Sequence, residues 1–264
     1  MPKNQNTAFA VITGASRGIG AEYARALAGQ GYDVLLIGRD KARLQAMQQE
    51  LQGDAQGGIW VEVLDLSQPK AAETLFALTR SYRSEVSLLI NNAGFGEYGD
   101  FAGMPMAAIN NMLQLHITTI VESIRLFLPA MLSRKQGAII TVASVAGFFP
   151  IPYITEYAAT KAFLIAFSEG LARETKNQGV TIQVCCPGFT DTDFHQTAGH
   201  QPKQVFFAQS PQQVVQTSLQ ALQSKRTVVT IGWQGRLAFW VSKIIPHAII
   251  MALAGKAVKP PSPL

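Results

Sequence analysis

Three side chains in the second half of the sequence have the types and the spacing for proton transfer at an oxygen atom. Tyr157 and Lys161 are four positions apart at the start of a helix-like segment, so their side chains share one face. Ser144 stands thirteen positions before Tyr157, after an apolar run with strand character. A phenol can protonate an alkoxide if an ammonium stabilises the phenolate, while a serine hydroxyl holds the reacting oxygen. These residues predict acid-base chemistry at a carbonyl or alcohol carbon, although the Tyr-x-x-x-Lys spacing alone is common.

A glycine-rich turn near the N-terminus has the composition of a pyrophosphate site. It follows the apolar run Phe9–Thr13 and opens a helix-like segment. Glycines let backbone N–H groups approach the anion, and the positive N-terminus of a helix favours it. A purely structural turn is the alternative interpretation of this motif taken alone. The candidate cofactor-binding residues in the turn are Gly14, Ser16, Arg17, Gly18, Ile19 and Gly20.

Arg39 follows the second predicted strand and lies nineteen positions beyond Gly20. At this place a dinucleotide site distinguishes a ribose hydroxyl from a 2′-phosphate. An acidic residue accepts from the hydroxyl, whereas a guanidinium pairs with the phosphate. Arg17 offers a second cation. Unless both arginines are solvated surface groups, which is the alternative, the expected cofactor is NADP(H) rather than NAD(H).

Polar residues also follow the third and fourth predicted strands, where open α/β sheets bind ligands. Asp65 and Leu66 are expected to contact an adenine, and the run from Asn91 to Gly94 is expected to line the nicotinamide side. In the alternative interpretation, Asp65 caps the next helix and the asparagines join strands. The candidate cofactor-binding residues in these two segments are Asp65, Leu66, Asn92, Ala93 and Gly94.

The elements that must position these residues alternate between strand-like runs and segments of helical periodicity, which is the pattern of βαβ units. Seven strands are predicted, at Phe9–Thr13, Asp33–Ile37, Trp60–Leu64, Ser87–Ile90, Ala138–Val142, Thr181–Cys185 and Thr227–Ile231. Helices are predicted at Ile19–Gln30, Lys41–Leu51, Pro69–Ser81, Met106–Arg134, Glu156–Asn177 and Pro211–Ser224. The predicted fold class is α/β: a single-domain, Rossmann-type, doubly wound, seven-stranded parallel sheet flanked by helices.

The chain of 264 residues is long enough for one large α/β domain, which we expect over residues 1–235. Residues 236–264 form an apolar C-terminal extension, predicted to be two short helices joined at Pro246. Lys243, Pro246 and His247 interrupt its apolar run, which argues against a membrane span. The extension is expected to make a peripheral membrane contact or, alternatively, to cover the substrate pocket or form a subunit contact.

The composition narrows the possible partners. The +5 net charge comes from Lys and Arg scattered along the sequence rather than from a basic run with aromatics, so no nucleic-acid partner is expected. Cys185 and Cys186 are adjacent and form no CxxC pattern, which predicts buried thiols and no metal site. The polar segment Met1 to Thr7 lacks the apolar stretch of a secretory signal. We therefore expect a cytoplasmic protein, with any membrane association made through the extension.

Taken together, the motifs resemble those of the short-chain dehydrogenase/reductase family, NADP-preferring subtype, over about the first 235 residues. The resemblance implies that Tyr157 is the general acid or base, that Lys161 also holds the nicotinamide ribose, and that Ser144 orients the reacting oxygen. It implies a homodimer or homotetramer built partly from the helices at 106–134 and 156–177. The matching positions are Thr13 to Gly20, Asp65, Asn91 to Gly94, Ser144, Tyr157, Lys161, and a loop expected to close over the nicotinamide, with Pro187, Gly188, Thr190 and Thr192.

One position departs from the family pattern. Family members usually have an Asn where His116 stands here, and that Asn holds a water that relays protons to the lysine. His116 can bind a similar water or transfer protons itself, because imidazole has a donor and an acceptor. We therefore count His116 among the catalytic candidates. The alternative is a packed histidine with no part in turnover.

These observations favour an NADP(H)-dependent oxidoreductase that moves a hydride between nicotinamide and a carbonyl or alcohol carbon of a small, apolar substrate. The polar segment from Phe194 to Ser210 is expected to cover that substrate. A nonenzymatic NADP(H)-binding regulator or scaffold is the alternative, suggested by His116 and the extension. The apolar pocket is predicted from Phe95, Phe148, Phe149, Ile151, Phe189 and Phe194.

Overall fold

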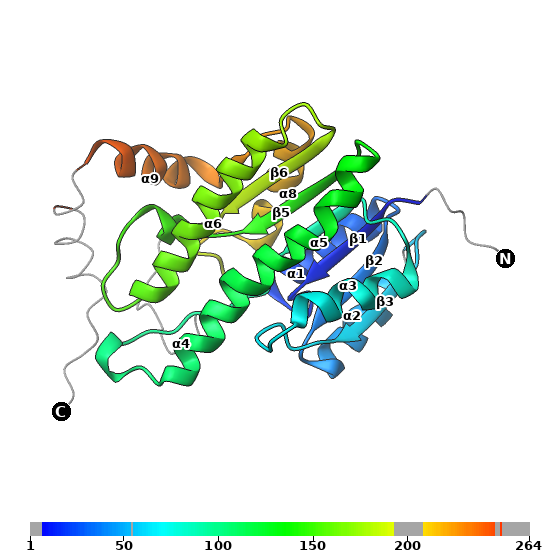
Figure 1. The fold of residues 1–264 in the computed structure, drawn as a ribbon, viewed down its shortest axis with the longest axis horizontal. Coiled ribbons are helices and arrows are strands. Elements are labelled where there is room, and N and C mark those ends of the chain that lie inside the picture. The colour runs from blue at the N-terminus through cyan, green and yellow to red at the C-terminus, as the bar shows by residue number, and fades with distance from the viewer. Residues whose placement is uncertain (1–6, 54, 193–207, 246–248, 250–264) are drawn as a thin grey trace.

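The computed structural model describes residues 7–53, 55–192, 208–245 and 249 (Figure 1). They fold around one seven-stranded sheet with the order β3-β2-β1-β4-β5-β6-β7, in which every neighbouring pair is parallel. The predicted doubly wound sheet is confirmed. The strands are β1 Phe9–Thr13, β2 Asp33–Gly38, β3 Ile59–Val63, β4 Leu88–Asn91, β5 Gly137–Val142, β6 Val180–Cys186 and β7 Val228–Thr230.

Helices cover both faces of the sheet and bury two hydrophobic layers. One layer holds side chains of α1 (Gly18–Gly29), α2 (Lys41–Gln52) and α8 (Pro211–Gln223). The opposite layer holds side chains of α3 (Ala71–Tyr82), α5 (Thr119–Ser133) and α6 (Thr155–Glu174). Because β1, β2 and β4 are buried along their whole length, their sequences are nearly continuous apolar runs rather than alternating ones.

The strand order reverses direction between β1 and β4, which are hydrogen-bonded neighbours although β2 and β3 separate them in the sequence. At such a point the connections leave the sheet toward opposite faces and a crevice opens beyond the carboxyl ends of the strands. The sheet therefore brings the glycine-rich turn after β1 beside the polar segment after β4. The segments that follow β5 and β6 also begin at this edge of the sheet.

The predicted helix Met106–Arg134 is interrupted in the structure. It consists of α4 (Met106–Leu113), one π-helical turn (Gln114–Thr118) and α5. The apolar periodicity continues through the turn, so the pattern predicts a single helix. A π-turn accommodates one extra residue, and such turns occur often at functional sites. Here the turn carries His116.

The whole stretch Met106–Ser133 has the length and composition of a membrane-crossing helix. However, 44% of its most apolar window is buried inside the fold, where Ile120, Ile124 and Phe127 contribute to the hydrophobic layer under α5. Core helices have the same composition, so this finding is weak evidence for a membrane span.

A helix spans the predicted domain boundary at residue 236. Helix α9 (Gly232–Ile244) follows β7 almost directly and lies at the outer edge of the molecule (Figure 1). Gly232 has φ +67, a conformation that glycine adopts without strain, and it turns the chain from the strand into the helix. The second predicted helix, after Pro246, lies outside the described residues except for Ile249.

Candidate active site

A cleft of about 630 Å³ opens at the carboxyl edge of the sheet. Nearly all the sequence-predicted site residues line it; Gly20 and His116 lie behind its wall. The predicted residues around the cleft are Gly14, Ser16, Arg17, Gly18, Ile19, Arg39, Asp65, Leu66, Asn92, Ala93, Gly94, Ser144, Tyr157, Lys161, Pro187, Gly188, Thr190 and Thr192.

The glycine-rich turn leaves no space for side chains at two positions. Gly14 has φ +66, and a Cβ there would lie 2.8 Å from the Cα of Ala93. A Cβ on Gly20 would lie 2.2 Å from the carbonyl oxygen of Gly14. Both glycines therefore let the turn pack against the segment after β4 and start α1 at Gly18. The first residues of α1, Gly18 and Ile19, line the cleft, and the first N–H groups of a helix have no intrahelical acceptor, an arrangement that suits a phosphate.

Thr13 and Asn92 hold the ends of β1 and β4 together. The Thr13 hydroxyl donates to the Ile90 carbonyl at 3.2 Å and accepts from the backbone N–H of Asn92 at 2.9 Å. The Asn92 amide donates to the carbonyls of Thr13, at 3.0 Å, and Gly14, at 3.2 Å. The alternative interpretation of Asn92 as a residue that joins strands therefore holds, and it is compatible with a place in the cleft wall. Thr13 is a positioning residue whose signal in the sequence was its place directly before Gly14.

Cations gather at the end of the cleft near β2. Arg17 and Arg39 are exposed there, as expected, and they are joined by Arg43, which sequence reasoning missed. Arg43 follows Asp40, whose carboxylate caps α2 by accepting from the Arg43 N–H at 3.0 Å and pairs with its guanidinium at 3.3 Å. The signal in the sequence was Asp40, a residue type that often caps helices and that lies three positions before Arg43. The end of the cleft near β2 thus presents three guanidinium groups to an anion.

Asp65 lies across from Arg39 but does not cap α3, whose N-cap position is Lys70. Its carboxylate accepts from the backbone N–H of Ser67 at 3.0 Å and the Ser67 hydroxyl at 2.7 Å. Burial acts to raise the pKa of Asp65, but these hydrogen bonds, one from Gln68 and the Arg39 charge together lower it. Asp65 is therefore a fixed carboxylate beside the cationic end of the cleft.

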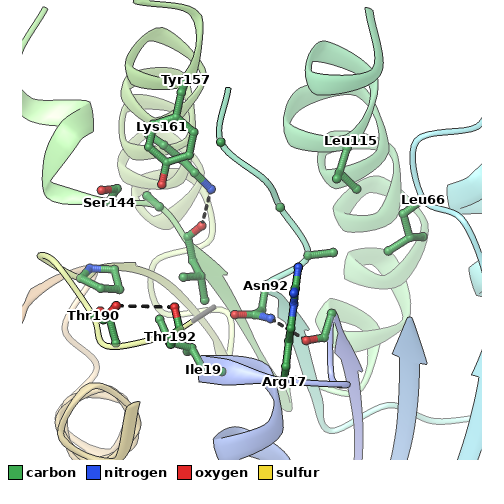
Figure 2. A pocket seen from close by; sticks show the side chains of 18 of the residues that line it. Arg17, Ile19, Leu66, Asn92, Leu115, Ser144, Tyr157, Lys161, Thr190 and Thr192 are labelled. Carbon is green, nitrogen blue, oxygen red and sulfur yellow. Dashed lines mark hydrogen bonds between the residues drawn. The ribbon is translucent and has the colours of Figure 1, made fainter. Parts of the chain in front are cut away.

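The loop after β6 folds back over the glycine-rich turn. The Thr190 hydroxyl donates to the Gly188 carbonyl at 3.1 Å, and the Thr192 hydroxyl donates to the Thr190 carbonyl at 3.5 Å (Figure 2). Thr192 lies against Gly18, where an added Cβ would be 3.1 Å from its Cγ2. Gln209 anchors the loop: its side-chain oxygen accepts from the Gly188 N–H at 3.0 Å, and its amide donates to the Ile231 carbonyl at 2.9 Å. Sequence reasoning missed Gln209, because nothing in its local pattern indicates a contact with a loop so far upstream. The predicted cover from Phe194 to Ser210 lies almost entirely outside the described residues.

Ser144, Tyr157 and Lys161 converge on the same end of the cleft (Figure 2). Tyr157 and Lys161 project from the first turns of α6, and the Lys161 ammonium lies 5.5 Å from the centre of the tyrosine ring. Ser144 follows β5; its hydroxyl interacts with that of Tyr157 and accepts from the Ala146 N–H at 3.1 Å. The predicted triad therefore forms one cluster.

Burial sets the charge states in this cluster. It lowers the pKa of Lys161 to about 8, while the ammonium donates to the Val142 carbonyl at 3.0 Å. It raises the pKa of Tyr157 to about 12, against the opposing effect of the hydrogen bond with Ser144. At neutral pH the cluster thus consists of a protonated phenol beside a mostly charged ammonium, which is the state that a proton donor requires.

His116 is completely buried behind Gly94, with both ring nitrogens hydrogen-bonded. Nε2 accepts from the backbone N–H of Phe95 at 3.1 Å, and Nδ1 lies 3.0 Å from the Thr160 hydroxyl. That hydroxyl donates to the Tyr157 carbonyl at 2.8 Å, so Nδ1 carries the ring proton and donates to it. Burial, with the nearby Lys161 charge, places the pKa of His116 well below 6.5. The imidazole is therefore neutral.

The aromatic residues predicted to form the pocket lie mostly elsewhere. Of these, Phe189 lines the cleft. Phe95 packs against His116, and Phe148 packs against Phe239 of α9, because the short helical turn at Val145–Phe148 directs Phe148 away from the cleft. Phe194 lies outside the described residues. The lining of the cleft includes instead a mixture of apolar and polar side chains, namely Leu115, Val145, Ala146, Ile154, Glu97 and Tyr98.

A protein-family model described as short chain dehydrogenase matches residues 8–203 of this chain. The chain belongs to the short-chain dehydrogenase family. It is thus an oxidoreductase acting on CH–OH or C=O groups, the first of the two functions predicted from the sequence.

Related proteins agree along most of this short-chain dehydrogenase. It is 32% identical to the very-long-chain 3-oxoacyl-CoA reductase of Anas platyrhynchos, over 96% of this chain and 80% of the relative. It is also 32% identical to the 3-oxoacyl-(acyl-carrier-protein) reductase FabG of Escherichia coli (strain K12), over 77% of this chain and 82% of the relative. Among solved structures, a short-chain dehydrogenase from Sphingobium yanoikuyae in complex with NADPH has a TM-score of 0.80 and 30% identity, covering 84% of this chain and 87% of that one.

Proposed function

We propose that this short-chain dehydrogenase is an NADP(H)-dependent reductase of carbonyl compounds with an apolar chain, of the 3-oxoacyl thioester class. The observation that carries the proposal is the convergence of Ser144, Tyr157 and Lys161 at one end of a cleft whose other end presents three arginines. Two relatives that are each 32% identical to this chain are named as 3-oxoacyl reductases, and a solved relative holds NADPH. These similarities support the thioester class and the cofactor.

The residues around the cleft fit an NADP(H) molecule. The turn from Gly14 to Gly20 gives a cradle that a Cβ would fill, at the positive end of α1. Arg17, Arg39 and Arg43 suit a 2′-phosphate, because a guanidinium forms paired, charge-assisted hydrogen bonds with phosphate oxygens. When bound, the nicotinamide supplies the hydride. Lys161 and the segment from Asn92 to Gly94 would hold its ribose side, and the loop from Pro187 to Thr192 would cover it.

In the reductive direction, Ser144 and Tyr157 orient the substrate carbonyl oxygen by hydrogen bonding. As negative charge develops on that oxygen, the Tyr157 hydroxyl donates its proton. The Lys161 ammonium, 5.5 Å from the centre of the tyrosine ring, stabilises the resulting phenolate in largely buried surroundings, where charge interactions are stronger than in water. Oxidation of the alcohol runs through the same groups in reverse.

A homodimer or homotetramer, common in this family, remains a prediction for this chain, and α6 offers the half-exposed Phe163 as a contact.

His116 supports this chemistry as a positioning residue rather than a proton carrier. Its two hydrogen bonds join the Phe95 backbone, on the segment after β4, to Thr160 on the helix that carries Tyr157. A neutral ring with both nitrogens engaged has no site left for a relay water. Its contacts therefore agree best with a packed histidine. Such a residue fixes the distance between the nicotinamide side of the cleft and Tyr157.

Replacing Tyr157 by Phe tests the proposed function. The change removes the proton donor but keeps the ring, so we expect NADPH oxidation with a 3-oxoacyl thioester to fall about a hundredfold or more, while NADPH affinity stays close to that of the unaltered chain. Tyr32→Phe is the matched control, because Tyr32 lies away from the cleft. Turnover by Tyr157→Phe at the level of the control would refute the assigned donor.

Replacing Arg39 by Asp tests the phosphate site. A carboxylate repels the 2′-phosphate and accepts from a ribose hydroxyl, so the ratio of NADPH to NADH affinity should fall about tenfold or more. Binding is measured by the fluorescence of each reduced nucleotide. Arg226→Asp makes the same charge change on an exposed turn far from the cleft and should leave the ratio unaltered. An unaltered ratio in Arg39→Asp would contradict the assignment.

Replacing His116 by Gln and by Leu separates positioning from proton transfer. Gln can still accept from the Phe95 N–H, whereas Leu leaves that donor unpaired at a cost of about 1–3 kcal/mol. We expect Gln to keep turnover within about tenfold of the unaltered chain and to preserve the shape of the pH profile, and Leu to lose more. If both variants lose activity equally and an ionisation disappears from the profile, the imidazole carries protons and the positioning role is wrong.

A further inference from the structure

Helix α9 exposes a stripe of large apolar side chains. Trp233, Leu237, Trp240 and Ile244 are spaced by four, three and four residues, so they share one face of the helix. Their exposed fractions are 64%, 54%, 61% and 75%. An exposed apolar stripe of this size usually marks an interaction surface.

The opposite face of α9 fixes the helix on the protein. Gly235 is buried against Thr230, where an added Cβ would lie 3.2 Å from the threonine Cβ. Phe239 packs edge to face on Phe148, with ring centres 5.5 Å apart. Because Gly235 and Phe239 hold this face to the domain, the exposed stripe lies on the other face of α9, a helix at the edge of the molecule (Figure 1).

Positive charge accompanies the stripe. Arg236 and Lys243 are exposed, are seven residues apart and lie along one flank of it. The Lys243 ammonium also lies over the Phe239 ring, 5.6 Å from its centre. The sequence from residue 194 to 264 contains no Asp or Glu but has Lys203, Lys225, Arg226, Arg236, Lys243, Lys256 and Lys259. This part of the sequence, which includes α9, therefore carries charge of one sign, which favours an anionic partner.

We propose that α9 docks on the surface of an anionic lipid bilayer, with the stripe inserted at the boundary between headgroups and acyl chains. Tryptophan rings favour this boundary, and flanking cations add attraction to anionic lipids. A second copy of the chain suits this face less well, because two apposed α9 helices would bring Arg236 and Lys243 against like charges with no acidic residue nearby in that part of the sequence.

Docking through α9 would place the reactive cluster next to the bilayer. The short helical turn at Val145–Phe148, on which Phe239 packs, begins one residue after Ser144. Val145 and Ala146 of the same turn line the cleft, so the cleft wall and the packing site of α9 share this short segment. A substrate with a long apolar chain partitions into bilayers and would reach the cleft from there. The docking itself does not depend on the proposed substrate class.

Intrinsic fluorescence gives a direct probe. Of the three tryptophans, Trp233 and Trp240 are on the stripe, whereas Trp60 packs between Phe9 and Tyr82 in the domain. In a Trp60→Phe chain we expect the emission to shift to shorter wavelength with vesicles of phosphatidylcholine and phosphatidylglycerol in equal parts, and the chain to sediment with them. Vesicles of phosphatidylcholine alone should bind it much less.

Two sets of substitutions identify the surface, with binding measured by sedimentation. Leu237→Glu with Trp240→Glu should abolish vesicle binding and leave NADPH affinity unchanged, which shows that the domain is folded. Arg236→Gln with Lys243→Gln should weaken binding to the anionic vesicles about thirtyfold, since each cation near such a surface contributes about 1 kcal/mol, or about fivefold. The matched control, Lys176→Gln with Arg226→Gln, removes the same charge from exposed positions away from α9 and should lose much less.

Three results would overturn the proposal. In the first, the chain with native α9 stays in the supernatant with anionic vesicles. In the second, Leu237→Glu with Trp240→Glu sediments with them as well as the unaltered chain, so that another segment makes the contact. In the third, the same double substitution converts a dimer to a monomer in gel filtration without lipid while vesicles bind neither form, which assigns the stripe to a contact between copies.

Discussion

The buried ammonium of Lys161 is the constraint on which the rest of the site depends. A lysine inside the fold is costly unless its charge finds partners, and here the Val142 carbonyl and the face of the Tyr157 ring supply them. Burial lowers the pKa of Lys161 to about 8, so the charge is present at neutral pH and is lost as the pH rises through that value. The ammonium is held beside Tyr157 because the last residue of β5 accepts its hydrogen bond and the first turns of α6 carry both side chains.

The sheet provides that register over a long span of sequence. Val142 ends β5, Tyr157 and Lys161 begin α6, and the glycine-rich turn follows β1, so the ends of parallel strands bring all of them to one edge. Thr13 and Asn92 fix the β1 and β4 ends to each other, and His116 links the segment after β4 to α6. These hydrogen bonds, joined by the backbone from Asn92 to Phe95, thus connect the glycine-rich turn with the helix that carries Tyr157.

Much of this arrangement was predictable from the sequence, because it depends on local patterns. Apolar runs and helical periodicity locate the strands within one or two residues, and the motif positions follow from the ends of those strands. Interactions between distant segments were not predictable. The π-turn that buries His116 has the same apolar pattern as a regular helix, and Gln209 contacts Gly188 across a gap that no local signal spans. Phe148 was misplaced for the same reason: its direction depends on a short turn whose partner, Phe239, lies in the C-terminal helix.

The most direct test of this account is an NMR titration of the lysine side chains, with Lys161→Met to assign the relevant signal. We expect one lysine signal, absent from the variant, to titrate near pH 8, because burial lowers the pKa of that ammonium. A Lys161 signal that titrates near 10.5, the ordinary value for lysine, would show that the ammonium is solvated. The charge arrangement from which the chemistry of Tyr157 is derived would then be wrong.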